Sequence, residues 1–235
     1  MAETAAHLAD HVLPRVPVRQ WVLSVPKRLR YYLQHDREAL NSALRIFLDA
    51  IEDHLCGRLG ASTQARTGAV AFIHRFGSAL NEHTHFHVVV IDGVFEPEPD
   101  PEQGVRFIAA QAIDADAVRV VQTQVRRRIL RAFVRRGRID TQTRKEIEAW
   151  DHGGGFSLDA SVRIEADDRK GLERLLRYYA RPPFAADRLE EPDPQVGRFR
   201  SHRLPTLLRR GFRRDLTRPR GEGVLRRRQL DFLFF

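Results

Sequence analysis

The sequence HTHFHVVVID at residues 83–92 has the pattern of a β-strand. Side chains alternate between the two faces of a β-strand, so an extended conformation places His83, His85 and His87 on one face. The apolar side chains between and after them point to the other face, toward a predicted core. Two imidazoles at positions i and i+2 can bind the same metal ion. The stretch therefore predicts a metal site, the alternative being a histidine-rich exposed strand without a metal.

A neighbouring strand supplies a further histidine. Residues 69–76 have the pattern of a strand and precede a short turn. If the two strands form a hairpin in which Phe76 faces His83, then His74 lies opposite His85 on the same face. His74 is therefore the predicted third ligand, and His83 competes for this role. Three neutral imidazoles suit zinc or manganese, and together with a substrate phosphate they can hold Mg²⁺ or Mn²⁺.

Length and composition limit the classes of protein that remain. The chain has 235 residues, enough for one large domain or two small ones. Its single cysteine, Cys56, excludes a disulfide framework and a cysteine-cluster zinc site within the chain. No apolar run approaches the roughly 20 residues of a membrane span, and the N-terminal stretch is amphipathic rather than a signal peptide. We therefore expect a cytoplasmic protein with no membrane partner.

The net charge of +9 is concentrated at the C-terminus. Residues 196–235 contain twelve arginines, no lysine and three acidic residues, which accounts for the whole net charge. The preceding residues balance to zero, so the basicity describes a tail and not the folded body. We predict a catalytic domain over residues 1–190 and an arginine-rich, irregular tail over 191–235.

The pattern of apolar residues predicts both helices and strands. Helices are expected at 2–13, 36–55, 114–136, 141–150 and 167–181. Strands are expected at 18–25, 69–76, 83–92, 105–109 and 156–164. Hairpins combined with interleaved helices favour an α+β fold, an antiparallel sheet flanked by helices.

Two adjacent tyrosines lie on the last predicted helix of the body. At about 100° per residue, Tyr179 falls on the apolar stripe of that helix and Tyr178 falls about 100° away from it. Tyr178 is thereby placed among the guanidinium groups of Arg174, Arg177 and Arg181. Such neighbours favour a phosphate and stabilise a phenolate, so Tyr178 is the candidate nucleophile. The alternative is an ordinary tyrosine at the boundary of an amphipathic helix.

Two other features bear on nucleic-acid binding. The helix predicted at 114–136 carries seven arginines off its apolar face, among them Arg127 and Arg131. This face is either a nucleic-acid surface or a solvated basic helix end. Tyr31 and Tyr32 follow three basic residues and are interpreted as packing at the start of a helix.

Several segments together resemble the rolling-circle insertion-sequence transposases of the His-hydrophobe-His (HUH) tyrosine endonuclease superfamily. The phrase NEHTHFH at 81–87, followed by DGVF at 92–95, resembles their histidine core. The sequence at 67–81 resembles the preceding strand and turn, and RYYARPPFA at 177–185 resembles their tyrosine-helix signature. The N-terminal residues 6–24 match as well, so the resemblance covers about residues 1–190.

This resemblance implies an enzyme that cuts single-stranded DNA at transposon ends. It implies that His85 and His87 hold a divalent metal, Mg²⁺ or Mn²⁺, and that Tyr178 attacks the scissile phosphate. The products are a 5′-phosphotyrosine and a free 3′-hydroxyl, and the covalent link conserves the phosphodiester for strand transfer. It also implies an HUH endonuclease-like antiparallel sheet.

The chain departs from the family pattern at three points. Two-tyrosine relatives space their tyrosines several residues apart, whereas Tyr178 and Tyr179 are adjacent. The cysteine-rich zinc module expected before the N-terminus is not in this sequence, and the resemblance fades after Glu191. The tail is therefore interpreted as the product of a truncation or frameshift, or else as a basic DNA-binding tail that orders on binding.

Three alternatives to an active transposase stay open. One is a catalytically inactive transposase remnant that only binds DNA through arginine. Another is a related replication initiator or relaxase, which shares the same chemistry. A third is a histidine-based metallohydrolase, although residues 88–91 are apolar where common forms of that class place an Asp-His pair.

Overall fold

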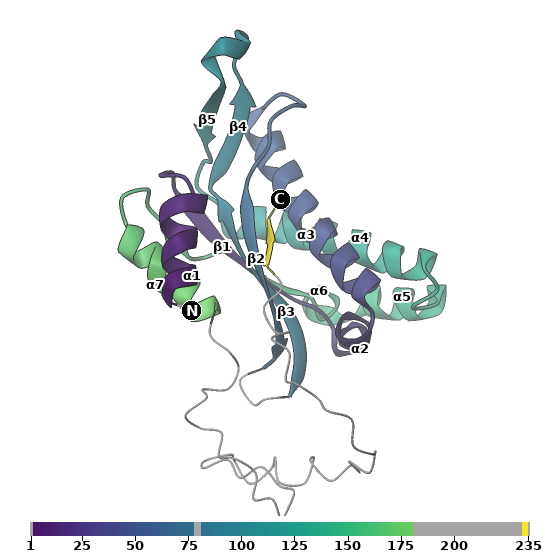
Figure 1. The fold of residues 1–235 in the computed structure, drawn as a ribbon. Coiled ribbons are helices and arrows are strands. Elements are labelled where there is room, and N and C mark those ends of the chain that lie inside the picture. The colour runs from purple at the N-terminus through teal and green to yellow at the C-terminus, as the bar shows by residue number, and fades with distance from the viewer. Residues whose placement is uncertain (1, 78–80, 181–231, 235) are drawn as a thin grey trace, which may run out of the picture. The chain divides into compact units, whose positions relative to one another are not determined.

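The computed structural model describes residues 2–77, 81–180 and 232–234 (Figure 1). The main sheet consists of β1 (Val18–Ser24), β2 (Ala69–Phe76), β3 (Glu82–Ile91), β6 (Ser157–Asp159), β7 (Arg163–Ile164) and β8 (Phe232–Phe234). A separate ribbon pairs β4 (Gly93–Pro97) with β5 (Val105–Ala109). The longer helices are α2 (Lys27–His35), α3 (Arg37–Leu59), α4 (Ala115–Arg135), α5 (Thr141–Ala149) and α7 (Arg169–Tyr179). Short elements complete the list: α1 (Ala2–His7), the π-helical turn η1 (Leu8–Val12), the 3-10 turn η2 (Pro101–Gln103) and α6 (Asp151–Gly154). The predicted α+β fold with an antiparallel sheet is confirmed.

The histidine strand β3 is the centre of the sheet. It pairs antiparallel with β1 on one side and with β2 on the other, in the order β6-β1-β3-β2-β8. His74 lies opposite His85, as predicted. The prediction that Phe76 faces His83 is wrong, because a shift in register between His74 and Phe76 places Phe76 opposite Glu82. The irregularity comes after the histidine pair, so it leaves their common face intact.

Each face of the sheet is covered by its own group of helices. On one face Phe86, Val88 and Val90 of β3 are buried under α2, α3 and α4. On the other face Phe72 and Val89 pack with α1, η1 and α7. Figure 1 shows these two groups on opposite sides of the sheet. Because side chains alternate along β3, its histidines share the second face with Val89.

Local signals explain where several elements begin and end. The Asp36 carboxylate accepts hydrogen bonds from the backbone N–H groups of Glu38 and Ala39 and so caps the start of α3. Gly60 ends α3 in the left-handed conformation, at φ 58°. The helix predicted from Asp36 is thus confirmed, and Tyr31 and Tyr32, interpreted as lying at a helix start, belong to the separate helix α2 before it.

Two further differences concern strands. The single strand predicted at 156–164 is divided into β6 and β7, and between them the carbonyl of Ala160 accepts a hydrogen bond from the Arg19 side chain. The ribbon strand β4 was not predicted and begins at Gly93 directly after β3. A Cβ at Gly93 would lie 2.3 Å from the Ile108 carbonyl oxygen, so only glycine allows the ribbon strands to approach this closely.

Asp92 joins three strands at the end of β3. Asp92 was expected to be a turn residue, but its side chain is buried. Arg19 donates to both carboxylate oxygens, at 3.0 and 3.1 Å, and Arg163 donates at 2.6 Å. Breaking a buried ion pair by removing one partner costs about 3–5 kcal/mol, so this cluster holds β1, β3 and β7 together.

The predicted boundary near residue 190 and nearly all of the arginine-rich tail lie outside the described residues. Within the tail only β8 is described, and it pairs with β2. Among the described helices, none combines the length and the hydropathy needed to cross a membrane.

Candidate metal centre

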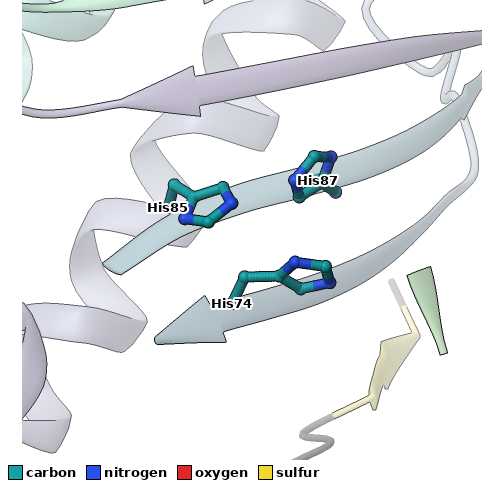
Figure 2. A group of neighbouring side chains, drawn as sticks. All are labelled: His74, His85 and His87. Atoms are coloured by element: carbon teal, nitrogen blue, oxygen red, sulfur yellow. The ribbon is translucent and has the colours of Figure 1, made fainter. Parts of the chain in front are cut away.

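Three imidazoles converge on one face of the sheet. His74 lies on β2, and His85 and His87 lie on β3; all three are half-buried. One nitrogen of each ring lies within 4.8 Å of the others (Figure 2). The ring centroids are 4.5 Å apart for His74 and His87, and 4.9 Å apart for His85 and His87. The structure therefore brings together the three residues selected as metal ligands.

Hydrogen bonds leave nitrogen atoms free for a ligand role. His85 Nδ1 donates to the His83 carbonyl at 2.7 Å, and His74 Nε2 donates to the Tyr179 carbonyl at 3.1 Å. A carbonyl only accepts, so in the neutral rings the opposite nitrogen carries the lone pair. His87 Nδ1 is buried and has no hydrogen-bond partner among the described residues. A buried polar atom without a partner is costly unless something binds there, so the residues fit a metal.

The electrostatics of the cluster keep the imidazoles neutral. Burial lowers the pKa of His87 to about 3, and the neighbouring His74 and His85 add to the effect. Burial also lowers the pKa values of His74 and His85. Neutral imidazole is the form that coordinates metals, so the cluster is in its ligand form at neutral pH.

His83 stands apart from this group. Its ring centroid lies 5.1 Å from that of His85, but the converging set consists of His74, His85 and His87. The backbone carbonyl of His83 orients the His85 ring, and the Nε2 of His83 is buried without a hydrogen-bond partner among the described residues. The geometry favours His74 over His83 as the third ligand.

The two adjacent tyrosines differ sharply in exposure. Asp168 caps α7 through the Gly171 N–H, and the apolar stripe of the helix faces the sheet. Tyr179 is 1% exposed and its ring centroid lies 4.4 Å from that of His87. Burial raises the pKa of Tyr179. Tyr178 is 61% exposed, with its ring 5.6 Å from that of Tyr179. The predicted difference in exposure is confirmed, and both tyrosines lie at the end of the helix that reaches the histidines.

One family model matches this chain. It is described as "Putative transposase" and covers residues 68–210, more than half of the 235 residues. The chain belongs to this transposase family. No curated protein and no solved structure matched in the corresponding searches.

The matched segment contains every residue of the candidate site. It begins at the start of β2 and runs through the histidines and both tyrosines of α7. It also extends beyond Glu191, where the resemblance noted from the sequence fades, into the first part of the arginine-rich tail. The family match therefore includes part of the predicted tail, up to residue 210.

The predicted DNA-binding arginines are divided between two places. Arg174 and Arg177 are exposed on α7, and Arg177 forms an ion pair with Glu173. Arg181 lies outside the described residues. Arg127 and Arg131 are exposed on α4, which covers the sheet face opposite the histidines. The α4 arginines of this transposase are thus not part of the histidine centre.

The aromatic side chains of α2 form a cluster that was not expected from the sequence. Tyr32 packs edge-on against Phe133 of α4, with ring centroids 5.9 Å apart. This contact agrees with the expectation that Tyr32 packs at the start of a helix. For Tyr31 that expectation is wrong, because its side chain is 65% exposed. The exposure of Tyr31 could have been predicted from the sequence. Lys27, Tyr31 and His35 recur at every fourth position and therefore share one polar helix face.

Proposed function

We propose that this transposase cuts single-stranded DNA at transposon ends and transfers the cut strand through a covalent tyrosine intermediate. His74, His85 and His87 hold a divalent metal, and Tyr178 is the nucleophile. The observation that carries the proposal is the convergence of three neutral imidazoles beside the end of the tyrosine helix. A replication initiator or relaxase would use similar groups, and the family match favours the transposase.

The histidines are suited to a metal with some affinity for nitrogen. Of the two ions proposed, Mn²⁺ accepts nitrogen ligands more readily than Mg²⁺, which prefers oxygen. When bound, the ion supplies a Lewis acid that polarises a phosphoryl oxygen. The protein holds two of the rings in place through the His83 and Tyr179 carbonyls, so both ligand rings have a set orientation.

Tyr178 is the better nucleophile of the two tyrosines because its hydroxyl belongs to an exposed side chain that DNA can reach. Attack forms a bond between the tyrosine oxygen and phosphorus and breaks the bond to the 3′ oxygen. The phenolic proton is lost to solvent, and the departing 3′ oxygen takes up a proton to become a hydroxyl. Tyr179 is buried, its raised pKa disfavours a phenolate, and its carbonyl positions His74.

The test is covalent capture of labelled single-stranded oligonucleotides that contain the ends of the element. With Mn²⁺ the wild-type chain should give a protein–DNA adduct on a denaturing gel, and a chelator should abolish it. Tyr178→Phe should form no adduct, because only the hydroxyl can attack. The matched variant Tyr179→Phe keeps the buried ring and should retain most of the activity.

Two outcomes would contradict this assignment. Loss of the adduct in Tyr179→Phe but not in Tyr178→Phe would make Tyr179 the nucleophile. Tight binding of the end sequences without any adduct in the wild-type chain would identify an inactive remnant that only binds DNA.

A further inference from the structure

An exposed aromatic cluster lies on α2, outside the histidine centre. The Tyr31 ring is stacked on the His35 ring, with centroids 4.6 Å apart and planes inclined by 29°. Lys27, Tyr31 and His35 are all exposed and follow one another at every fourth position of the helix. The opposite face of α2 packs through Leu29 and Leu33, which are buried in the core. Tyr31 therefore exposes most of its side chain on the solvent side of α2.

A second aromatic side chain joins this cluster through Arg28. Trp150, between α5 and α6, is 40% exposed. The Arg28 guanidinium lies over its ring, 5.3 Å from the centroid, and donates to Glu146 at 2.7 Å. Arg28 and Tyr31 are three residues apart on α2, so they are neighbours on its surface. Exposed rings and cationic groups thus lie next to one another on the surface of α2 and at Trp150 after α5.

Such a surface has the chemistry of a single-strand binding site. Three aromatic side chains are among the large exposed hydrophobic residues of the described chain, namely Tyr31, Trp150 and Tyr178. Tyr178 has a role in the proposed reaction, and the other two belong to this cluster. Proteins that bind unpaired nucleic acid combine stacking aromatic rings with cationic groups for the backbone, because every base has a π-face.

The cluster is fixed to the strands that carry the histidines. Thr84, between His83 and His85 on β3, donates to the Gln34 side chain of α2 at 2.8 Å. The Arg75 side chain on β2 donates to the Gln34 carbonyl at 3.2 Å. Figure 1 shows α2 beside β3 near the end of the hairpin. α2 is therefore joined by hydrogen bonds to both strands that carry the histidines, on the opposite face of the sheet.

We propose that Tyr31, His35, Arg28 and Trp150 form a platform on which unpaired bases of single-stranded DNA stack. The choice of DNA rests on the proposed function, which this platform extends by holding unpaired bases on α2, on the sheet face opposite the histidines. Lys27 and Arg28 attract the phosphates, and the rings take the bases.

The test uses tryptophan fluorescence with a short oligothymidylate and a chelator, so that no cutting takes place. The chain has two tryptophans, and Trp21 is only 1% exposed, so quenching by a ligand reports on Trp150. Single-stranded oligothymidylate should quench the emission. A duplex of the same length and an abasic oligomer should quench far less, because neither offers an unpaired base.

Matched variants separate stacking from charge. Tyr31→Ala should weaken binding by about tenfold, the scale expected for one lost stacking contact, whereas Tyr31→Phe keeps the ring and should bind like wild type. Because Tyr31 is exposed, alanine at this helical position should leave the fold intact, which circular dichroism would verify. Arg28→Ala should weaken binding and reduce its dependence on salt.

The outcomes distinguish this proposal from the proposed function. Equal quenching by the abasic oligomer, or unchanged binding by Tyr31→Ala, would overturn the platform and make the cluster a structural contact between α2 and α5. Tyr178→Phe should bind oligothymidylate normally even though it forms no adduct. A normal adduct in the wild type without quenching would reject the platform and leave the nicking reaction standing.

Discussion

The two faces of β3 belong to one strand but present different kinds of surface, one apolar and one polar. On the first face Phe86, Val88 and Val90 are at most 1% exposed and lie entirely under helices. On the second face Val89 is buried near α7, but His87 and His85 further along the strand are only half-buried. The helical cover on this face ends where the histidines begin. One face therefore stabilises the sheet over its whole length, and the other leaves a polar cluster beside the end of α7.

The largest expected effect is on the covered face. Phe86→Ala removes a fully buried ring between sheet and helices, so it should lower the free energy of unfolding by about 3–5 kcal/mol. His85→Ala, the adjacent residue on the other face, should cost less than about 1 kcal/mol in the absence of metal. Urea denaturation measures both. Equal losses would show that the two faces do not differ in this way.

The second expected effect is confined to the histidine face. Mn²⁺ at about 100 times its dissociation constant should stabilise the wild-type chain by about 2.7 kcal/mol, seen as a rise in melting temperature. His87→Ala and His74→Ala should abolish this rise because each removes one of three converging ligands. His83→Ala is the matched control and should keep it. A loss in His83→Ala with retention in His74→Ala would exchange the third ligand.

The third prediction concerns pH in the metal-free protein. The pKa of His87 is about 3 in the folded state, below its ordinary value near 6.5, so the unfolded chain binds a proton that the folded chain does not. Stability is full above pH 6.5 and falls as the pH is lowered toward 3, by up to about 1.4 kcal/mol per pH unit for this one group. His87→Asn should flatten the dependence between pH 6.5 and 5. An unchanged dependence in His87→Asn would reject burial of this imidazole as the cause.

The smallest expected effect lies beyond the covered face, on α4. If Arg127 and Arg131 contact DNA phosphates, replacing both by alanine should reduce the slope of log affinity against log salt by roughly 0.7 for each lost contact. Arg128→Ala on the same helix is the control, since its guanidinium already pairs with Asp53 at 2.7 Å. An unchanged slope in the double variant would make the α4 arginines a solvated helix surface.

Period-two alternation made the histidine face predictable. It placed His85 and His87 together, and the expected hairpin brought His74 opposite His85, as the register has it. The exposure of Tyr178 and the burial of Tyr179 followed from helical periodicity in the same way. Both inferences depend only on local repeats, which is why they needed no knowledge of distant contacts.

Features that depend on partners far along the chain could not be predicted. Asp92 resembled a turn residue because its two arginine partners lie more than 70 residues away in the sequence. Where the strand at 156–164 divides, Ala160 bonds to Arg19, a partner 141 residues away that a local pattern does not reveal.

The Asp92 cluster has a consequence for the order in which the chain is made. Arg19 leaves the ribosome first, Asp92 follows, and Ala160 and Arg163 come last. Until those late residues arrive, the buried carboxylate lacks one of its two cationic partners, and one Arg19 N–H lacks its carbonyl. A nascent chain that stops before these residues can form the hairpin of β2 and β3. It cannot form the ion-pair cluster that joins β1 to β3 and β7. Synthesis must therefore pass residue 163 before β7 can pair with β1. The tyrosine helix α7 follows within a few residues, so the pairing of these strands and the arrival of the tyrosines come close together in time.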